Sequence, residues 1–161
     1  MLSKKNQFIQ LIRHPVKFRI FLFFKLPITF FSGLTVKELN EEIAIVSIPY
    51  KWFTQNPFKS TYFACLAMAA EMSTGLLAML YTYKSDPSIS MLVTGLEASY
   101  FKKATGITYF TCLQGNVIYQ TIEEAIKTGD GKSVKITSTG KNNVGEIIAI
   151  FNITWSFKIK R

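Results

Sequence analysis

The most apolar long segment of the chain runs from residue 61 to residue 81 and reads TYFACLAMAAEMSTGLLAMLY. A single charged side chain, Glu71, stands near its middle. About 20 apolar residues are enough to cross a bilayer, although an acid at mid-bilayer is costly. A helix that is apolar on every face is otherwise buried in a protein core. The alternatives are a membrane span with a functional acid, a core helix with a structural acid, or the central helix of an enzyme.

Strand-like segments dominate the remainder of the chain. Runs rich in β-branched and aromatic residues, bounded by Gly, Pro, Asn or Asp, are typical of strands. Such runs occupy residues 41–50, 88–101, 106–113, 132–140 and 146–159. Gly95, inside the second run, predicts a bulge or a close backbone approach. A turn at residues 141–145 is expected to join the last two strands.

Two helices complete the pattern. The apolar helix is expected from about Pro57 to Tyr83, and Asn56 is a ready N-cap for such a start. A shorter helix is expected at residues 116–129, where isoleucines recur every four residues and Gly129 suits the C-cap. A largely antiparallel sheet that wraps the long helix would hide it without lipid. The pattern therefore predicts an α+β fold and disfavours a membrane span.

The first part of the chain is basic and apolar. Residues 1–37 contain seven Lys or Arg and no Asp or Glu. Phe18 and Leu22 follow helical spacing, and no cleavage site of a signal peptide closes the apolar run. We expect residues 1–32 to form a basic amphipathic helix packed on a domain made of residues 33–161. A weak contact of this helix with a membrane surface is the alternative.

Composition excludes several classes of protein. The chain has 161 residues, 48% of them hydrophobic, which fits one globular domain that needs no metal or disulfide to fold. Cys65 and Cys112 lie in apolar runs and His14 is the single histidine. We therefore expect a reduced cytoplasmic protein with no metal site. The net charge of +9 favours phosphate-bearing partners, but no nucleic-acid motif is present and we expect no nucleic-acid partner.

The segment GDGKS at residues 129–133 looks like a phosphate-binding loop. That loop requires an earlier glycine at the position of Ile126, and it joins a strand to a helix. Here the segment ends a predicted helix and opens a predicted strand. We therefore reject it as a nucleotide site.

Two other segments carry a resemblance to a known family. NPFKSTYFACLAMAAEMSTG at residues 56–75 and LEASYFKKATG at residues 96–106 resemble the helix and a strand end of the hotdog-fold acyl-CoA thioesterases, of the phenylacetyl-CoA thioesterase type. The chain is still more similar to an uncharacterised hotdog family grouped with the thioesterases. The resemblance covers roughly residues 33–158. It implies a hotdog fold, in which a largely antiparallel sheet wraps a long central helix.

The resemblance also implies roles for individual residues. Glu71 takes the family's acid position, as general base on water or as a nucleophile, and burial should raise its pKa. Asn56 matches a family Asn that orients the water or the carbonyl. Tyr62, Phe63 and Ala64 replace the family's His-Gly-Gly, where backbone N–H groups polarise the thioester carbonyl. The N–H of Phe63 or Ala64 is then the expected oxyanion donor.

Two lysines are the expected contacts of the coenzyme A phosphates. Lys102 takes the family's Arg position and Lys103 follows it. A solvated strand end is the alternative interpretation of this pair. The coenzyme A moiety belongs to the substrate, and no separate cofactor is expected.

Helix geometry adds a condition on the site. Phe63 and Glu71 are eight residues apart, which corresponds to about 12 Å of helix rise. One chain therefore cannot bring both groups to a single carbonyl. The oxyanion donor and the acid must come from facing subunits, so a homodimer or a tetramer is expected.

These observations lead to two expected functions. The first is an acyl-CoA thioesterase that hydrolyses a fatty or aromatic acyl thioester at a subunit interface. The alternative is a non-catalytic hotdog protein that binds an acyl chain or acyl-CoA, because bulky Tyr62 and Phe63 stand where the family has His and Gly. A structural role for Glu71, hydrogen-bonded to Ser73 or Thr74, stays open beside both.

Overall fold

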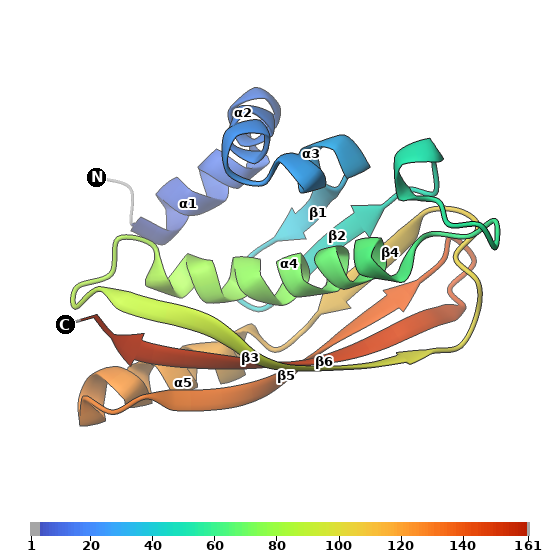
Figure 1. The fold of residues 1–161 in the computed structure, drawn as a ribbon. Coiled ribbons are helices and arrows are strands. Elements are labelled where there is room, and N and C mark those ends of the chain that lie inside the picture. The colour runs from blue at the N-terminus through green and yellow to red at the C-terminus, as the bar shows by residue number, and fades with distance from the viewer. Residues whose placement is uncertain (1–3, 161) are drawn as a thin grey trace.

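The computed structural model describes residues 4–160 as one antiparallel six-stranded sheet with helices on its faces (Figure 1). Residues 1–3 and 161, which belong to the predicted ranges 1–32 and 33–161, lie outside the described residues. The elements are α1 (Lys4–Arg13), α2 (Pro15–Lys25), α3 (Pro27–Ser32), β1 (Thr35–Leu39), β2 (Ala44–Ile48), η1 (Trp52–Thr54), α4 (Phe63–Thr82), β3 (Ile89–Tyr100), β4 (Thr108–Cys112), α5 (Gly115–Thr128), β5 (Lys132–Lys141) and β6 (Ile147–Ile159).

The sheet has the strand order β1-β2-β4-β5-β6-β3, and each neighbouring pair is antiparallel. Figure 1 shows α4 lying along one face of the sheet, with α1, α2 and α3 on the far side of α4. The bulge expected at Gly95 is present, because the register between β3 and β6 shifts between Val93 and Gly95. The α+β fold with a long helix against a largely antiparallel sheet is confirmed.

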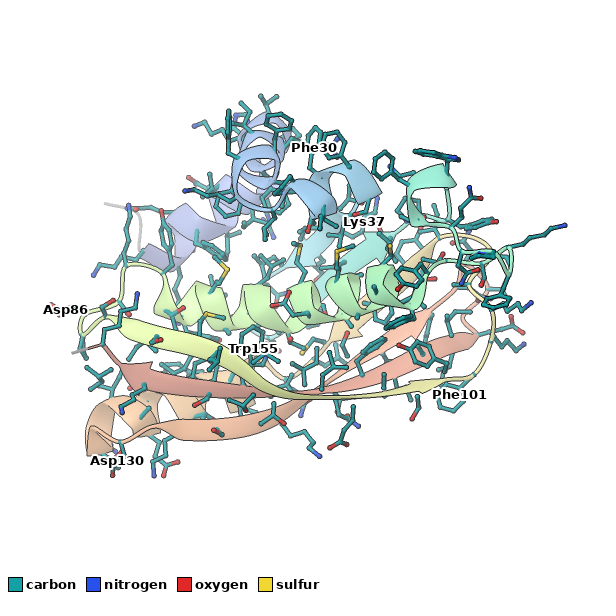
Figure 2. All side chains as sticks on the ribbon, in the orientation of Figure 1. Phe30, Lys37, Asp86, Phe101, Asp130 and Trp155 are labelled. Carbon is teal, nitrogen blue, oxygen red and sulfur yellow. The ribbon has the colours of Figure 1, made fainter. Side chains whose placement is uncertain are left out.

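Helix α4 is buried on most of its surface. Its sequence is rich in Ala, Leu and Met, which favour helix and carry no polar atoms that need partners. The hydroxyl groups on this helix are hydrogen-bonded: Ser73 Oγ, for example, lies 2.8 Å from the Ala70 carbonyl and 2.7 Å from Ser138 Oγ on β5. Trp155 on β6 donates from Nε1 to Thr74 Oγ1 over 2.9 Å. Figure 2 places Trp155 between α4 and the sheet, so these bonds fix the helix to the strands.

Helix α4 alone among the described helices is long and apolar enough to cross a membrane. In its most apolar 18-residue window, 67% of the residues are buried inside the protein. The core helix of a folded domain passes the same test of length and composition. Burial against the sheet therefore accounts for its apolar character.

The start of the long helix differs from the prediction. It begins at Phe63 and not near Pro57. Residues 56–60 instead form a tight turn in which the Asn56 side-chain oxygen accepts from the N–H of Phe58 at 3.0 Å and of Ser60 at 3.3 Å. Lys59 has a positive φ of 58°, which a helix does not allow. The predicted N-cap role of Asn56 is therefore wrong, because its side chain closes this turn.

The N-terminal region contains three helices where one was expected. Pro15 and Pro27 each start a new helix, since proline suits the first turn and interrupts a preceding one. Gly33 ends α3 in the left-handed region at φ 75°. Phe8 on α1 is buried and its ring centroid lies 5.1 Å from that of Tyr83. The division into an N-terminal part and a domain stays a prediction.

One glycine allows α5 to pack against the turn between β1 and β2. The Gly115 N–H donates to the Glu42 carbonyl over 3.1 Å. A Cβ on Gly115 would lie 2.1 Å from the Glu41 carbonyl oxygen and 2.8 Å from the Glu42 Cα. Both neighbours are backbone atoms, so no rotamer change relieves the clash.

We therefore expect Gly115→Ala to lower the free energy of unfolding by about 2–3 kcal/mol, despite the better helix propensity of alanine. Urea unfolding followed by circular dichroism measures this change. Gly106→Ala is the matched control, because nothing lies within 4 Å of the added Cβ. Equal stability of the two variants would contradict the prediction.

Candidate functional site

Glu71 lies on the face of α4 that is turned towards the N-terminal helices. It lines a cavity of about 270 Å³ enclosed by apolar side chains of α1, α2, α4 and β3. Phe18 and Leu22 of α2 close the cavity on one side, and Met72 and Met91 line it on the others. Glu71 is the charged residue among its lining side chains. A carboxylate on the wall of an apolar cavity is a candidate for acid–base chemistry.

The Glu71 carboxylate has no recorded hydrogen bond or ion pair among residues 4–160. Ser73 and Thr74, the neighbours that a structural acid would use, direct their hydroxyls elsewhere: Ser73 to Ala70 and Ser138, and Thr74 to the Glu71 backbone carbonyl over 2.9 Å. Burial raises the pKa of the Glu71 carboxyl, as expected from the sequence. The group is therefore poised to take up a proton.

Gly75 provides the space that the Glu71 side chain occupies. A Cβ at this position would lie 3.2 Å from Glu71 Oε1 and 3.3 Å from Trp155 Cζ2. Position 75 lies one helical turn after Glu71, on the same face of α4. The missing side chain lets the carboxyl lie against the helix between Trp155 and the cavity.

The raised pKa has a consequence for stability. A folded-state pKa above the unfolded value means that the folded state binds the proton more tightly, so stability is greatest below the unfolded pKa and falls as pH rises through the folded pKa. The variant Glu71→Gln has no carboxyl group at this position, so it does not lose this stability as the pH rises. We expect the melting temperature of the variant to exceed that of the wild type at pH 8 by more than it does at pH 5, measured by differential scanning calorimetry. A difference that is independent of pH would contradict the assignment.

A second candidate region lies where α4 begins. An open pocket of about 550 Å³ is lined by the turn after η1, the first turn of α4 and the loop that follows β3. Thr61 ties these parts together by donating its N–H and hydroxyl to the Ala104 carbonyl, at 2.8 and 3.1 Å. Figure 2 places Phe101 at this end of the molecule. Four predicted site residues line this pocket together: Asn56, Phe63, Lys102 and Lys103.

The start of α4 leaves two backbone donors unused. The N–H groups of Cys65 and Leu66 bond to the Tyr62 carbonyl, and no hydrogen bond to the N–H of Phe63 or Ala64 is recorded among residues 4–160. Tyr62 provides no side-chain cap. The helix therefore presents free N–H groups at its positive end, which suits an oxyanion.

Asn56 and the two lysines have defined partners around this pocket. Asn56 Oδ1 also accepts from Ser60 Oγ over 3.3 Å, so its oxygen is fully engaged in the turn. Lys102 forms an ion pair with Glu146, whose carboxyl pKa it lowers. Lys103 Nζ lies 3.4 Å from the Phe58 carbonyl. Both lysines therefore lie at the rim of the pocket, and the positive charge of Lys102 is already paired with the Glu146 carboxylate.

The structure separates the two halves of the predicted site within one chain. Glu71 lines the cavity under α2, whereas Asn56 and Phe63 line the pocket at the start of α4. Sequence reasoning missed Glu146, which pairs with Lys102 from the far end of the last hairpin. It also missed that α2 would wall the Glu71 cavity, although the spacing of Phe18 and Leu22 already indicated an inward face.

Residues 4–160 contain no cluster of three or more His, Cys, Asp or Glu side chains arranged to hold a metal ion. Cys65 and Cys112 are both free and buried, and burial raises the pKa of each thiol, that of Cys112 to about 11 despite a backbone hydrogen bond at Gln114 that lowers it. Neither thiol is therefore a ready nucleophile.

Solved structures share this arrangement of helix and sheet. The chain superimposes on PA5026 from Pseudomonas aeruginosa, a protein of unknown function and probable thioesterase, with a TM-score of 0.75 and 20% identity over 91% of this chain and 97% of that one. It superimposes on the thioesterase HI1161 from Haemophilus influenzae with a TM-score of 0.61 and 10% identity, over 99% of this chain and 92% of that one. A protein of unknown function from Chlorobaculum tepidum gives a TM-score of 0.75 and 16% identity, over 97% of this chain and 94% of that one.

These likenesses define the class of protein: the chain has a hotdog fold, as the resemblance in its sequence implied. Residues 16–157 match the family model described as a domain of unknown function, DUF4442. The chain therefore belongs to the DUF4442 family. No curated protein matches its sequence significantly.

Proposed function

We propose that the protein is a thioesterase that hydrolyses a fatty or aromatic acyl thioester of coenzyme A. The observation that carries this proposal is Glu71, a carboxyl with a raised pKa and no recorded partner among residues 4–160, on the wall of an apolar cavity. Such a group can accept a proton from water, and the apolar walls around it suit an acyl group. A probable thioesterase and a thioesterase have the same fold, which supports the hydrolysis of a thioester.

The proposed reaction uses groups from two subunits. Glu71 removes a proton from a water molecule, which attacks the thioester carbonyl carbon. The carbonyl oxygen becomes negatively charged and is stabilised by the N–H of Phe63 or Ala64 at the start of the partner's α4. The tetrahedral intermediate then collapses, the carbon–sulfur bond breaks, and protonated Glu71 returns its proton to the leaving thiolate. The products are a carboxylic acid and free thiol.

We propose a homodimer because each chain holds the two sets of groups apart. Phe63 and Glu71 are eight residues apart on α4, or about 12 Å of rise. Strand β3 offers a surface for pairing: it has twelve residues and pairs with β6 on one side, and no strand of residues 4–160 covers its other edge. An open edge of this length readily pairs with another strand. The coenzyme A phosphates would then meet Lys103 and Lys102 at the pocket rim.

A second candidate function is binding of acyl-CoA without hydrolysis. The side chains of Tyr62 and Phe63 favour it, because both stand at the start of α4 and are 45% and 56% exposed. Their ring centroids lie 4.8 Å apart, and these bulky side chains belong to the residues at the free N–H groups, where glycine would leave more room for a thioester. For either function we propose a cytoplasmic location, which suits two free and buried thiols.

The test is release of thiol from a panel of short, long and aromatic acyl-CoAs, with the purified full chain and with Glu71→Gln beside it. Turnover that depends on Glu71 supports the thioesterase. The dependence of turnover on acyl length then indicates which length of acyl group the apolar cavity accepts. Calorimetric binding of acyl-CoA with turnover no greater than that of Glu71→Gln would instead support the binding protein. Absence of both binding and turnover would overturn both candidates.

A further inference from the structure

Large apolar side chains gather on the outer side of α2, α3 and η1. This surface, the apolar ridge, is defined by Phe23, Phe24, Ile28, Phe31, Trp52 and Phe53. Phe24, Ile28 and Trp52 are 73%, 70% and 76% exposed. Figure 1 shows α2, α3 and η1 on the same side of α4, away from most of the sheet. The exposed apolar side chains therefore share one side of the molecule.

The rings of the apolar ridge are in contact with one another across three elements. The ring centroids of Phe23 and Phe24 lie 5.2 Å apart, and those of Phe23 and Phe31 lie 6.2 Å apart. Phe31 stacks on Phe53 at 5.7 Å, and Phe53 contacts Trp52 at 5.3 Å. Contiguous apolar surface on a folded protein usually marks a binding surface, whereas single exposed residues do not.

Helix α2 is apolar on two opposite sides. Phe18 and Leu22 are buried and line the Glu71 cavity, whereas Phe23 and Phe24 are exposed. A helix that is apolar all round normally has both sides covered. Within residues 4–160, other parts of the protein cover the inner side of α2 alone. The outer side is therefore available to a binding partner.

The charges around the apolar ridge indicate the kind of partner. Lys17, Arg19, Lys25 and Lys51 are exposed beside it, and residues 1–37 contain no acid. The Arg19 guanidinium lies 4.3 Å from the centroid of the Phe30 ring, which Figure 2 shows among the side chains of the same region. Aromatic residues flanked by cations suit the boundary between anionic headgroups and acyl chains.

We propose that the apolar ridge docks the protein on the surface of a membrane that contains anionic lipid. The aromatic side chains enter the headgroup boundary and the four cations meet lipid phosphates. A second copy of the chain is a poorer occupant, because a two-fold contact through this surface sets cations against cations. In the docked protein the Glu71 cavity lies on the far side of α2 from the lipid, about one helix diameter (~10 Å) away.

The test is binding of the full chain to phosphatidylcholine vesicles with and without about 30% phosphatidylglycerol, measured by co-sedimentation. We expect binding to the anionic vesicles that weakens with added salt. The double variant Phe24→Ser, Trp52→Ser should bind at least tenfold more weakly. The matched control is Leu113→Ser, Val144→Ser, whose side chains are 66% and 78% exposed elsewhere and should leave binding unchanged.

Two triple variants, each with three fewer positive charges, distinguish docking through the apolar ridge from attraction by the net charge of the protein. Loss of one cation at the surface should weaken binding roughly fivefold. The triple variant Lys17→Gln, Arg19→Gln, Lys25→Gln should therefore bind at least tenfold more weakly. Its control carries the same loss of charge at three exposed lysines outside the ridge: Lys127, Lys158 and Lys160. Equal weakening by both triple variants would overturn the proposal.

Tryptophan fluorescence reports the depth of docking. The chain has two tryptophans, and Trp155 is 4% exposed whereas Trp52 is 76% exposed. Vesicles should shift the emission of Trp52 to shorter wavelength, and brominated acyl chains should quench it. The variant Trp52→Phe keeps the ridge aromatic and should still bind, without the shift.

Two outcomes would overturn the proposal. One is the absence of binding to anionic vesicles. The other is a self-association in solution that Phe24→Ser, Trp52→Ser abolishes while vesicles leave Trp52 unaffected, which would make the ridge an interface between copies. Glu71→Gln should bind vesicles as the wild type does, so the result does not depend on the proposed thioesterase activity.

Discussion

Thioester hydrolysis by Glu71→Gln is expected to be at least a hundredfold slower in kcat than hydrolysis by the wild type. General base catalysis by a placed carboxylate typically contributes 10²- to 10⁴-fold, and an amide cannot accept the proton. Glutamine has nearly the same shape, so it fills the space beside Gly75 and leaves the cavity walls in place. The KM for the thioester should therefore change little. The measurement is steady-state thiol release with both proteins.

The pH dependence provides a second readout of the same residue. The base must be ionised, so kcat/KM should rise with pH through the raised pKa of Glu71 and level off above it. Glu97→Gln is the matched control, since Glu97 is an exposed glutamate that pairs with Lys135 at 2.8 Å. Full activity of Glu71→Gln, or an equal loss in Glu97→Gln, would remove Glu71 from the reaction.

Phe63→Pro is expected to lower kcat by about 10²- to 10³-fold if the Phe63 N–H holds the oxyanion, which is the usual effect of losing one such donor. Proline removes this N–H and is tolerated in the first position of a helix. The preceding residue, Tyr62, has φ −61° and ψ 135°, the backbone conformation that a residue before proline prefers. Phe63→Ala is the control, because it removes the ring and keeps the N–H. It should stay active.

Mixed dimers test the assignment of the two groups to different subunits. After subunit exchange, equal amounts of Glu71→Gln and Phe63→Pro should recover about one quarter of wild-type activity, because half of the dimers are mixed and each mixed dimer has one intact site. Each variant alone should keep the mass of a dimer in light scattering. No recovery after confirmed exchange would mean that the donor and the acid act within one chain. Loss of activity in Phe63→Pro and Phe63→Ala alike would assign the effect to the ring.

Long periodic segments made most of the fold predictable. The apolar helix, the short helix with Gly129 at its end and five of the six strands follow from local pattern alone. The missed strand was β1, Thr35–Leu39, which has only five residues and exposes Lys37 and Glu38. Its pairing with β2 stabilises it, and such pairing leaves little local signal.

The beginning of the long helix was misplaced because one local signal has two structural outcomes. Asn before Pro suits a helix start, and it equally suits a turn in which the Asn side chain accepts backbone N–H groups. The bridge between Gln55 and Thr61 and the bonds from Thr61 to Ala104 favour the turn. Both involve partners that local sequence pattern does not bring together.

The sequence and the tertiary structure also determined different features of the candidate site. The amino-acid order alone singled out Glu71, because one carboxylate in 21 otherwise uncharged residues must be either partnered or functional. Only the tertiary structure decided that it has no recorded partner among residues 4–160, that α2 closes its cavity, and that Lys102 pairs with Glu146. Helix and strand patterns are set by neighbours a few residues apart. Cavities and ion pairs depend on residues that only the folded chain brings within contact distance.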